Sequence, residues 1–188
     1  MKKGLAHIET ARLWLRPCTP DDIDRLHQIW TEPGVRKYLW DDEIISRQQT
    51  IAIVEGSIEQ FAAQGDGIWV MGLHDEVTVI GFCGFWFFHE PPQLELLYGL
   101  TTTSWNKGLT TEAARAMMRY GFEERDFSTI LASTDAPNTA SIRVMEKTGM
   151  TFQKREEAEG LDTIFYTVDR KAFGWGEEEY HVTYRSEA

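Results

Sequence analysis

A short loop with a single glycine joins two patterned stretches of the sequence, and it could hold an anion. Residues 94–101 predict a buried strand, and residues 111–125, rich in Ala, Met and Arg, predict a helix. The first amide groups of a helix lack partners inside the helix, and the helix dipole gives them a partial positive charge. Gly108 allows the main chain to approach a ligand closely, and Lys107 adds a positive charge. The junction is interpreted as a phosphate or pyrophosphate site, with an ordinary glycine turn as the alternative.

The spacing of this loop excludes the usual nucleotide-binding loops. A P-loop has Gly, four residues and then Gly-Lys-Ser/Thr, whereas Lys107 and Gly108 stand in the reverse order. A dinucleotide fold has G-x-G-x-x-G between strand and helix, and Gly108 stands alone in its loop. The histidines show no ligand spacing such as H-E-x-x-H, and two cysteines are too few for a zinc quartet. We therefore expect no metal site.

Composition predicts a globular protein with a real core. The chain has 188 residues, of which 42% are hydrophobic, and a formal charge of −11, which argues against direct binding of nucleic acid. The longest apolar run, residues 79–88, is too short to span a membrane, and no export signal is visible. With only two cysteines, the chain fits a reducing cytoplasm.

Hydrophobic periodicity predicts a mixed α/β sandwich, in which antiparallel strands are followed by alternating strands and helices. The expected strands are residues 12–16, 68–73, 77–88, 94–101, 129–134, 151–157 and 161–169. The expected helices run from Thr19 or Asp21 to Pro33-Gly34, over 46–63, over 111–125, and from Asn138 to Gly149. Asp75-Glu76 fits a tight hairpin, and Asn138 is a strong N-cap candidate. Residues 173–184 form an acidic and aromatic tail.

Three motifs in a fixed order give the chain a specific likeness to a known family. Residues 94–100 (Leu-Glu-Leu-Leu-Tyr-Gly-Leu), 105–113 (Trp-Asn-Lys-Gly-Leu-Thr-Thr-Glu-Ala) and 138–150 resemble the GNAT superfamily of N-acetyltransferases. Residues 10–17 and 35–39 resemble its branch that acetylates the N-termini of ribosomal proteins, so the likeness covers about residues 8–170. It implies one domain over residues 1–188, with a tail at 171–188. The implied fold is α/β, a mostly antiparallel central sheet flanked by helices, with a splayed strand pair that forms the CoA site.

The resemblance implies an acetyl-CoA site around the glycine loop. In the family, the strand at residues 98–100 pairs with the pantetheine arm, and the loop at 107–111 wraps the pyrophosphate with backbone amides. The implied donor contacts are Tyr98, Gly99, Leu100, Asn106, Lys107, Gly108, Leu109, Thr110, Thr111, Asn138, Ser141 and Lys147. Thr110 departs from the usual Gly or Ala, and Trp105 from the Arg or Gln of the wider superfamily.

Two of these donor contacts also have a simpler interpretation. Asn138 and Ser141 lie three residues apart on one helical turn, and simple helix capping explains both. The resemblance instead has Asn138 touching pantetheine and Ser141 bonding the CoA sulfur. Two i, i+4 pairs of basic residues could meet the 3′-phosphate of CoA or form surface ion pairs: Arg115 with Arg119, and Arg143 with Lys147.

Acetyl transfer requires a neutral amine, a donor for the developing oxyanion and a thiolate that can leave. The amide of Leu100, freed where the strand splays, is the predicted oxyanion donor. Ser141, or alternatively Tyr98, is placed to assist the thiolate, which needs modest help because a free thiol has a pKa of about 8.5. Glu95 shares a strand face with Gly99 and is the predicted base, acting through a water if burial raises its pKa. The alternative is a carboxylate that orients the amine or faces solvent.

The acceptor side is less constrained by the sequence. Trp40 falls between the first two predicted helices, where the family covers its acceptor, and it is a candidate pocket floor or a core residue. His89 and Glu90 are a second candidate pair for base or substrate binding, with a plain loop as the alternative. Glu95 is the third predicted acceptor contact.

The leading hypothesis is an enzyme that moves an acetyl group from acetyl-CoA to a primary amine by direct attack in a ternary complex. The favoured acceptor is the N-terminal α-amine of a protein or peptide, and the acidic surface suits a basic acceptor such as a ribosomal protein or a polyamine. One alternative is a small antibiotic or metabolite amine, and another is a CoA-binding sensor without turnover. We expect a cytoplasmic monomer or homodimer with neither nucleic acid nor membrane as a partner.

Overall fold

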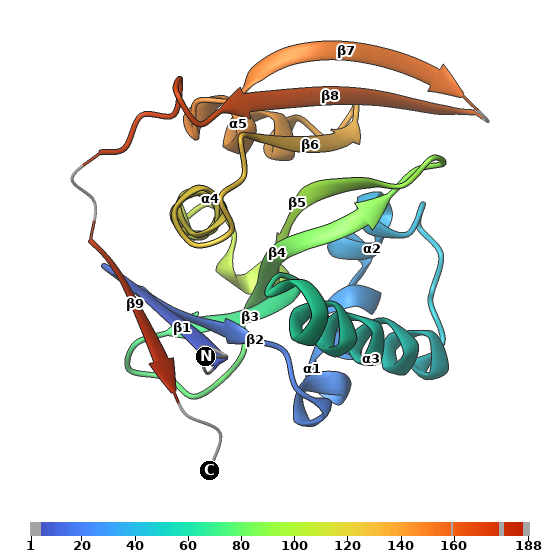
Figure 1. Ribbon diagram of the computed structural model, residues 1–188. Helices are drawn as coiled ribbons and strands as arrows, with labels where there is room; N and C mark the ends of the chain where they lie inside the picture. Colours follow the sequence, from blue (N-terminus) through green and yellow to red (C-terminus); the bar gives the residue numbers. More distant parts are fainter. Residues whose placement is uncertain (1–4, 159, 177–178, 186–188) are drawn as a thin grey trace.

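The computed structural model describes residues 5–158, 160–176 and 179–185, which form a central sheet with helices on both faces (Figure 1). The strands are β1 (Leu5–Thr10), β2 (Leu13–Pro17), β3 (Ile68–Leu73), β4 (Gly81–Phe88), β5 (Gln93–Leu100), β6 (Thr129–Asp135), β7 (Thr151–Ala158), β8 (Leu161–Asp169) and β9 (Tyr180–Arg185). Their order in the sheet is β7-β8-β6-β5-β4-β3-β2-β1-β9. The helices are α1 (Ile23–Thr31), α2 (Pro33–Leu39), α3 (Arg47–Gln64), α4 (Leu109–Glu123) and α5 (Thr139–Lys147), with 3₁₀ turns at Pro20–Asp22 and Thr102–Ser104.

The sheet separates two hydrophobic clusters. Helix α4 fills the larger cluster, together with inward side chains of the strands. On the other face, α1 and α3 cover a second cluster that includes Leu26, Val54 and Val70. Strand alternation explains the division, because neighbouring residues such as Phe82 and Cys83 of β4 belong to different clusters.

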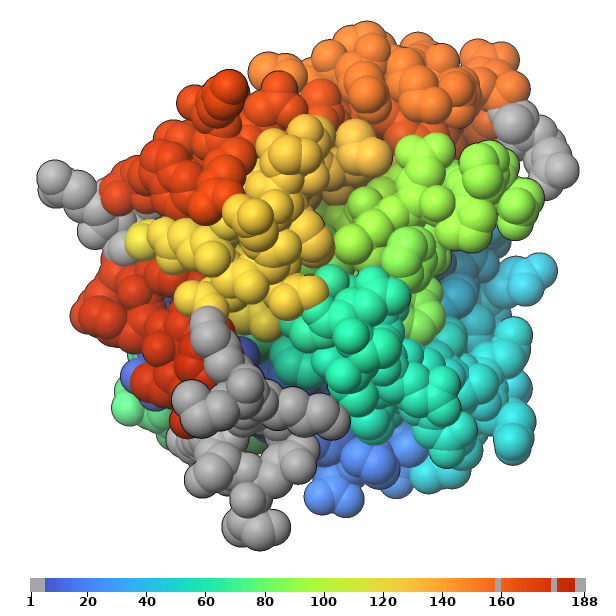
Figure 2. All heavy atoms as spheres, viewed as in Figure 1, coloured from blue at the N-terminus to red at the C-terminus, as the bar shows by residue number. Residues whose placement is uncertain are grey.

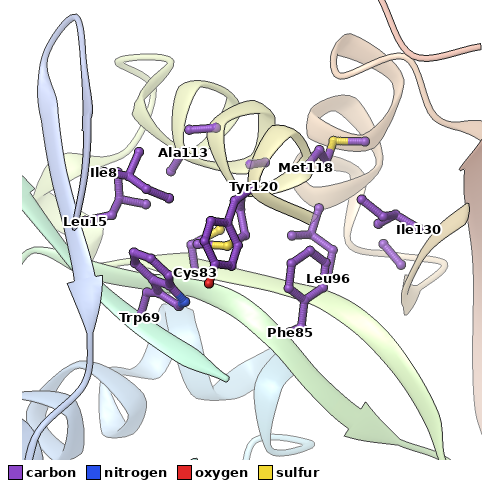
Figure 3. Close-up of a cluster of buried hydrophobic side chains, with 14 of the residues drawn as sticks. Ile8, Leu15, Trp69, Cys83, Phe85, Leu96, Ala113, Met118, Tyr120 and Ile130 are labelled. Carbon is purple, nitrogen blue, oxygen red and sulfur yellow. The ribbon is translucent and has the colours of Figure 1, made fainter. Parts of the chain in front are cut away.

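Helix α4 is anchored along most of its length. Tyr120 points from it toward the sheet, where Trp69 and Phe85 lie, while Met118 points to another side of the helix (Figure 3). The rings of Trp69 and Tyr120 meet edge to face with their centroids 5.0 Å apart. Each fully buried large side chain contributes about 1.5–3 kcal/mol of burial free energy. The direction of the first turn of α4, which would face an anion, is thus fixed by the core.

One strand pair opens in the middle of the sheet, as predicted. Strands β5 and β6 run parallel and pair at Glu95 with Leu131. Beyond this point toward Leu100 the two strands separate, and Figure 1 shows the gap between their ribbons. Every other strand pair that the described residues form is antiparallel.

Most predicted elements are confirmed within a few residues, and the cap of α5 is confirmed in detail. The side-chain oxygen of Asn138 accepts a hydrogen bond from the Ser141 amide at 3.3 Å. Gly149 follows the helix at φ +88°, the left-handed region that glycine tolerates best.

One helix was missed, and two local predictions around the start of β4 are wrong. Pro33 ends α1 but also begins α2, because proline has the φ of a first helical residue and needs no donor there. Strand β4 begins at Gly81 instead of Val77, and Glu76 closes a turn by donating its amide to the Leu73 carbonyl at 3.0 Å. The connection between β3 and β4 therefore spans residues 74–80 and is no tight hairpin at Asp75-Glu76.

The predicted tail is partly a strand, and its partner was also missed. Strand β9 pairs antiparallel with β1 along six residues, from Leu5 with Arg185 to Thr10 with Tyr180. Each strand depends on the other, more than 170 residues away, so neither shows a strong local signal. In the space-filling view, the red C-terminal part forms one surface with the neighbouring yellow segment (Figure 2). None of the helices within the described ranges is long and apolar enough to cross a membrane.

Candidate active site

The gap between β5 and β6 exposes main-chain groups of β5. The amide of Thr101 donates to the Ile80 carbonyl at 2.8 Å, so it points toward the neighbouring strand β4. Because amide directions alternate along a strand, the amides of Tyr98 and Leu100 point the other way, into the gap. Gly99 lies between them, and any side chain there would meet the Phe82 ring at 2.4 Å. Glycine at this position lets that ring pack against the strand.

Helix α4 begins beside this gap with its first amides uncapped by a side chain. Gly108 is the N-cap at φ +76° and offers no side-chain acceptor. Leu109, Thr110 and Thr111 form the first turn, whose amides lack intrahelical acceptors and can bind an anion. Asn106 is also left-handed, at φ +61°, and Lys107 beside it is exposed. The loop thus has the local geometry that the sequence predicts.

A salt bridge braces this loop from behind, and sequence reasoning missed it. Both oxygens of Glu112, in the first turns of α4, are bound by Arg12: its amide reaches Oε1 at 2.8 Å and its Nε reaches Oε2 at 2.6 Å. Thr10 adds a hydroxyl donor to Oε1 at 2.7 Å. The Arg12 Nη1 also donates to the Lys107 carbonyl at 2.8 Å. This bond turns the Lys107 carbonyl toward the β1–β2 turn.

The first turn of α5 meets β5 through Ser141 and Tyr98. The Tyr98 hydroxyl lies 3.0 Å from Ser141 Oγ and donates to the Ser141 carbonyl at 3.1 Å. Burial raises the pKa of Tyr98 well above its ordinary value, so the phenol keeps its proton at neutral pH. Asn138 also donates through Nδ2 to Thr134 Oγ1 at 2.9 Å, which fixes the cap to β6. Two hydroxyl groups therefore sit together between β5 and α5.

The basic residues predicted for the 3′-phosphate lie apart from this meeting point. Lys147 is exposed in the last turn of α5, about 9 Å of helix rise beyond Ser141. Arg115 donates to the Gly174 carbonyl at 2.7 Å, and Arg119 lies 4.4 Å from the centroid of the Tyr180 ring. Arg115 and Arg119 thus face the C-terminal segment. A cavity of about 380 Å³ lies there, between α4, the β1–β2 turn and β9.

Glu95 forms a polar cluster at the closed end of the gap. Its side chain is 2% exposed, and Ser133 Oγ of β6 donates to Oε2 at 2.5 Å. His89 Nε2 lies 3.0 Å from Glu95 Oε1 and 3.2 Å from Ser133 Oγ. Burial raises the pKa of Glu95, against the opposing effects of the Ser133 hydrogen bond and of His89. A raised pKa moves a carboxylate toward the range in which it can act as a base near neutral pH.

The acceptor side is built partly by aromatic packing. Trp40 belongs to the cluster under α1 and α3, and its ring meets Trp30 edge to face at 6.0 Å. Trp105 was given no site role by the sequence, yet its Nε1 donates to the Leu100 carbonyl at 2.8 Å. Glu32, at the start of α2, accepts bonds from Thr101 Oγ1 at 2.5 Å and from the Thr102 amide at 2.8 Å. These contacts tie the helices of the acceptor side to the end of β5.

The structure brings the predicted residues together in two groups. The donor group comprises the Tyr98–Leu100 stretch, the loop at 106–111, Asn138 and Ser141, all at the gap or at helix ends beside it. His89 and Glu95 form the second group. Trp40 packs in the cluster under α1 and α3, and within the described part of the chain no cluster of three or more His, Cys, Asp or Glu could hold a metal ion.

Comparisons with known proteins point to one family. Residues 12–151 match the family described as acetyltransferase (GNAT) domain. The chain is 29% identical over 179 residues to the uncharacterized N-acetyltransferase p20 of Bacillus licheniformis, with 88% of this chain and 97% of the relative covered. It is 26% identical to the FsC-acetyl coenzyme A-N(2)-transacetylase of Aspergillus fumigatus, with 96% of this chain and 77% of the relative covered.

Solved structures share the fold. An acetyltransferase of the GNAT family from Bacillus anthracis matches with a TM-score of 0.73 at 24% identity, over 88% of this chain and 99% of that chain. The RimL ribosomal L7/L12 alpha-N-protein acetyltransferase, solved in complex with coenzyme A, matches with a TM-score of 0.72 at 18% identity, over 87% and 97%. At these identities the likeness establishes the architecture alone.

Proposed function

The chain belongs to the GNAT acetyltransferase family, and from this premise we propose that it transfers the acetyl group of acetyl-CoA to the N-terminal α-amine of a protein or peptide. One observation carries the proposal. The amides of Tyr98 and Leu100 point into a gap of the sheet that also borders the uncapped first turn of α4. A strand with free amides and a helix start with free amides match a ligand that has both an extended amide arm and a diphosphate.

The residues present fit coenzyme A. Gly108 carries no Cβ at the point of closest approach, and a Cβ there would have only Arg12 as a neighbour, at 3.6 Å. The loop at 106–111 would hold the diphosphate, and the Tyr98–Leu100 edge would pair with the pantetheine amides. Acetyl-CoA supplies an activated acetyl thioester; the chain supplies orientation, hydrogen-bond donors and proton transfer.

Three groups at the gap are assigned roles in the reaction. We assign Glu95 as the base that takes a proton from the incoming ammonium, because its burial raises its pKa. The Leu100 amide is assigned to the acetyl oxygen, and one such donor contributes roughly 3–4 kcal/mol to a transition state. Ser141 Oγ, which lies 3.0 Å from the Tyr98 hydroxyl, is assigned as the hydrogen-bond donor to the departing sulfur.

The acceptor class rests on two kinds of support. The fold neighbour RimL is named a ribosomal L7/L12 alpha-N-protein acetyltransferase, and, independently, the net charge of −11 favours a basic acceptor. A small-molecule amine is the second candidate, because a relative that covers nearly the whole chain is named an acetyl coenzyme A-N(2)-transacetylase.

A thiol-release assay separates these candidates. The purified protein is incubated with acetyl-CoA and, in turn, with peptides that begin with Ser or Ala, with polyamines and with small antibiotic or metabolite amines. Release with the peptides and none with the small amines supports the protein-directed function, and the reverse result selects the small-molecule one. Tight CoA binding by calorimetry without release for any amine would leave a sensor and overturn the enzyme.

A further inference from the structure

His89 connects the buried Glu95 carboxylate to solvent. Its Nε2 is 3.0 Å from Glu95 Oε1, and its side chain is 32% exposed, whereas that of Glu95 is 2% exposed. Ser133 Oγ contacts both partners, at 2.5 Å from Glu95 Oε2 and 3.2 Å from His89 Nε2. Among the described residues no group donates a hydrogen bond to Glu95 Oε1, and His89 Nε2 lies within ion-pair distance of this oxygen.

The surrounding structure holds the imidazole in this position. His89 follows β4 at φ +66°, a left-handed conformation that turns the chain at the end of the strand. Its ring packs against Phe165, with centroids 5.1 Å apart. Phe165 on β8 is the register partner of Ser133 on β6, so one row of the sheet supports both contacts of the cluster. The histidine is therefore placed by packing as well as by its polar contacts.

A buried base needs a way to discharge the proton that it collects. A carboxylate that is almost closed to water would stay protonated after each acetyl transfer unless a neighbour removes the proton. Imidazole is the side chain that gains and loses a proton most readily near neutral pH. We propose that His89 is the proton exit of Glu95, and that Ser133 is the positioning residue that aims the carboxylate at it. This proposal rests on the proposed acetyl transfer.

The transfer balances in three steps. The acceptor ammonium gives one proton to the Glu95 carboxylate and becomes the neutral nucleophile. The carboxylic acid then gives this proton from Oε1 to Nε2 of the neutral imidazole, and the imidazolium releases one proton to bulk water. No electrons are exchanged with an external reagent. The hydrogen bond from Ser133 occupies Oε2, so Oε1 is the oxygen left to face His89.

Two other charged groups lie close to this pair in the sequence or in the sheet: Glu90 follows His89 directly, and Lys154 lies on β7. On the β7–β8 side, the Lys154 ammonium lies 4.4 Å from the centroid of the Phe165 ring and pairs with Glu156 at 2.8 Å. Both Lys154 and His89 thus pack against the Phe165 ring. On the β5 and β6 sides, the groups facing Glu95 are His89 and Ser133.

The test is chemical rescue of His89→Ala. In this variant, kcat for the best amine acceptor should fall at least about tenfold. The KM for acetyl-CoA should stay within twofold, and imidazole added to the buffer should restore kcat in a saturable way. The matched control is His181→Ala, an exposed histidine on β9 that should leave kcat unchanged with or without imidazole. Unchanged kcat in His89→Ala, or a loss that imidazole does not restore, would overturn the proposal.

Two further measurements keep the proposal testable. Ser133→Ala should lower kcat and shift its acid limb, and an unchanged pH profile would remove Ser133 from the arrangement. The double variant Glu95→Gln/His89→Ala should be no slower than Glu95→Gln alone, and additive losses would contradict the shared proton route. If wild-type protein acetylates no amine, the proposed function fails and the exit role falls with it. If the wild type is active and His89→Ala has the same kcat, the proton-exit role is overturned and the proposed function stands.

Discussion

The two halves of the candidate site are built by different means. The donor half relies on main-chain amides, whose directions follow from strand alternation in β5 and from the start of α4. The acceptor half relies on side chains, and its central contact joins a buried carboxylate to a partly exposed imidazole. Main-chain donors tolerate sequence change around them, whereas side-chain contacts are lost with one substitution. The donor half should therefore fail through changes of backbone shape, and the acceptor half through changes of single functional groups.

Gly108→Glu should break the donor half most severely. The added side chain would start 3.6 Å from Arg12 Nη2, so its carboxylate would compete with Glu112 for Arg12 and disturb the loop, and φ +76° is unfavourable for any side chain. We expect CoA affinity by calorimetry to fall at least about 100-fold. The matched control is Gly149→Glu, which has a similar φ of +88° with no heavy atom within 4 Å of an added Cβ. It should lose comparable stability and keep CoA affinity. Equal CoA binding by wild type and Gly108→Glu would remove the loop from the site.

Glu95→Gln should give the opposite signature. We expect kcat to fall about 100-fold, as for removal of a general base, with CoA affinity unchanged. Because burial raises the pKa of Glu95, wild-type kcat should decline on the acid side at a higher pH than an ordinary glutamate would give. Glu59→Gln, at an exposed position on α3, is the control and should match wild type. A Glu95→Gln variant that keeps the full rate and the same acid limb would assign the base to another group.

Arg12→Ala tests whether side chains contribute to the donor half indirectly. Loss of the brace should loosen the Lys107 carbonyl and weaken CoA binding about tenfold, with kcat at saturation near that of wild type. Glu112→Gln should behave alike, and the double variant should be no worse than either, because both remove one contact network. Arg47→Ala, which breaks a similarly exposed pair with Asp24, is the control. Strictly additive losses would show that Arg12 and Glu112 act separately.

Contacts between residues close in the sequence could be predicted, whereas contacts between distant residues could not. The donor half was predicted because its signals are local: an apolar run, one glycine and an Asn138 cap within three residues of Ser141. The salt bridge between Arg12 and Glu112 was not predicted, because the two residues are 100 positions apart and each has the sequence context of an ordinary surface charge. The pairing of β1 with β9 is non-local in the same way.

The acceptor half shows a different limit. His89 and Glu95 were both named as candidates, yet their contact was not predicted. In the β4–β5 register, Glu95 lies opposite Trp86, while His89 falls beyond the last pair, Phe88 with Gln93. The contact depends on a left-handed turn at His89, which that residue type does not dictate. Trp40 illustrates the converse case, since core packing and a pocket role look identical in sequence.

Ser141→Ala removes a hydroxyl group that lies between β5 and α5, and we expect a smaller loss of activity than for the variants above. The substitution keeps the backbone amide of residue 141, which donates a hydrogen bond to Asn138 Oδ1, so the α5 cap remains intact. Tyr98 can still donate to the residue 141 carbonyl, which limits the disturbance. We expect kcat to fall roughly fivefold and CoA affinity to change less than twofold, as for loss of one neutral hydrogen bond. Steady-state kinetics with calorimetry measure both, and an unchanged kcat would reduce Ser141 to its part in the helix turn.

The smallest expected effect is on the free energy of unfolding, which should depend on pH because Glu95 is buried. Because the pKa of Glu95 is raised in the folded protein, the folded state keeps a proton that the unfolded chain has released between the two pKa values. Stability should therefore fall as pH rises through that window, by at most about 1.4 kcal/mol per pH unit for one proton. Urea unfolding across this range should show that slope in wild type and a flatter one in Glu95→Gln. Equal slopes would mean that Glu95 is not strained by burial, and the case for a base poised near neutral pH would weaken with it.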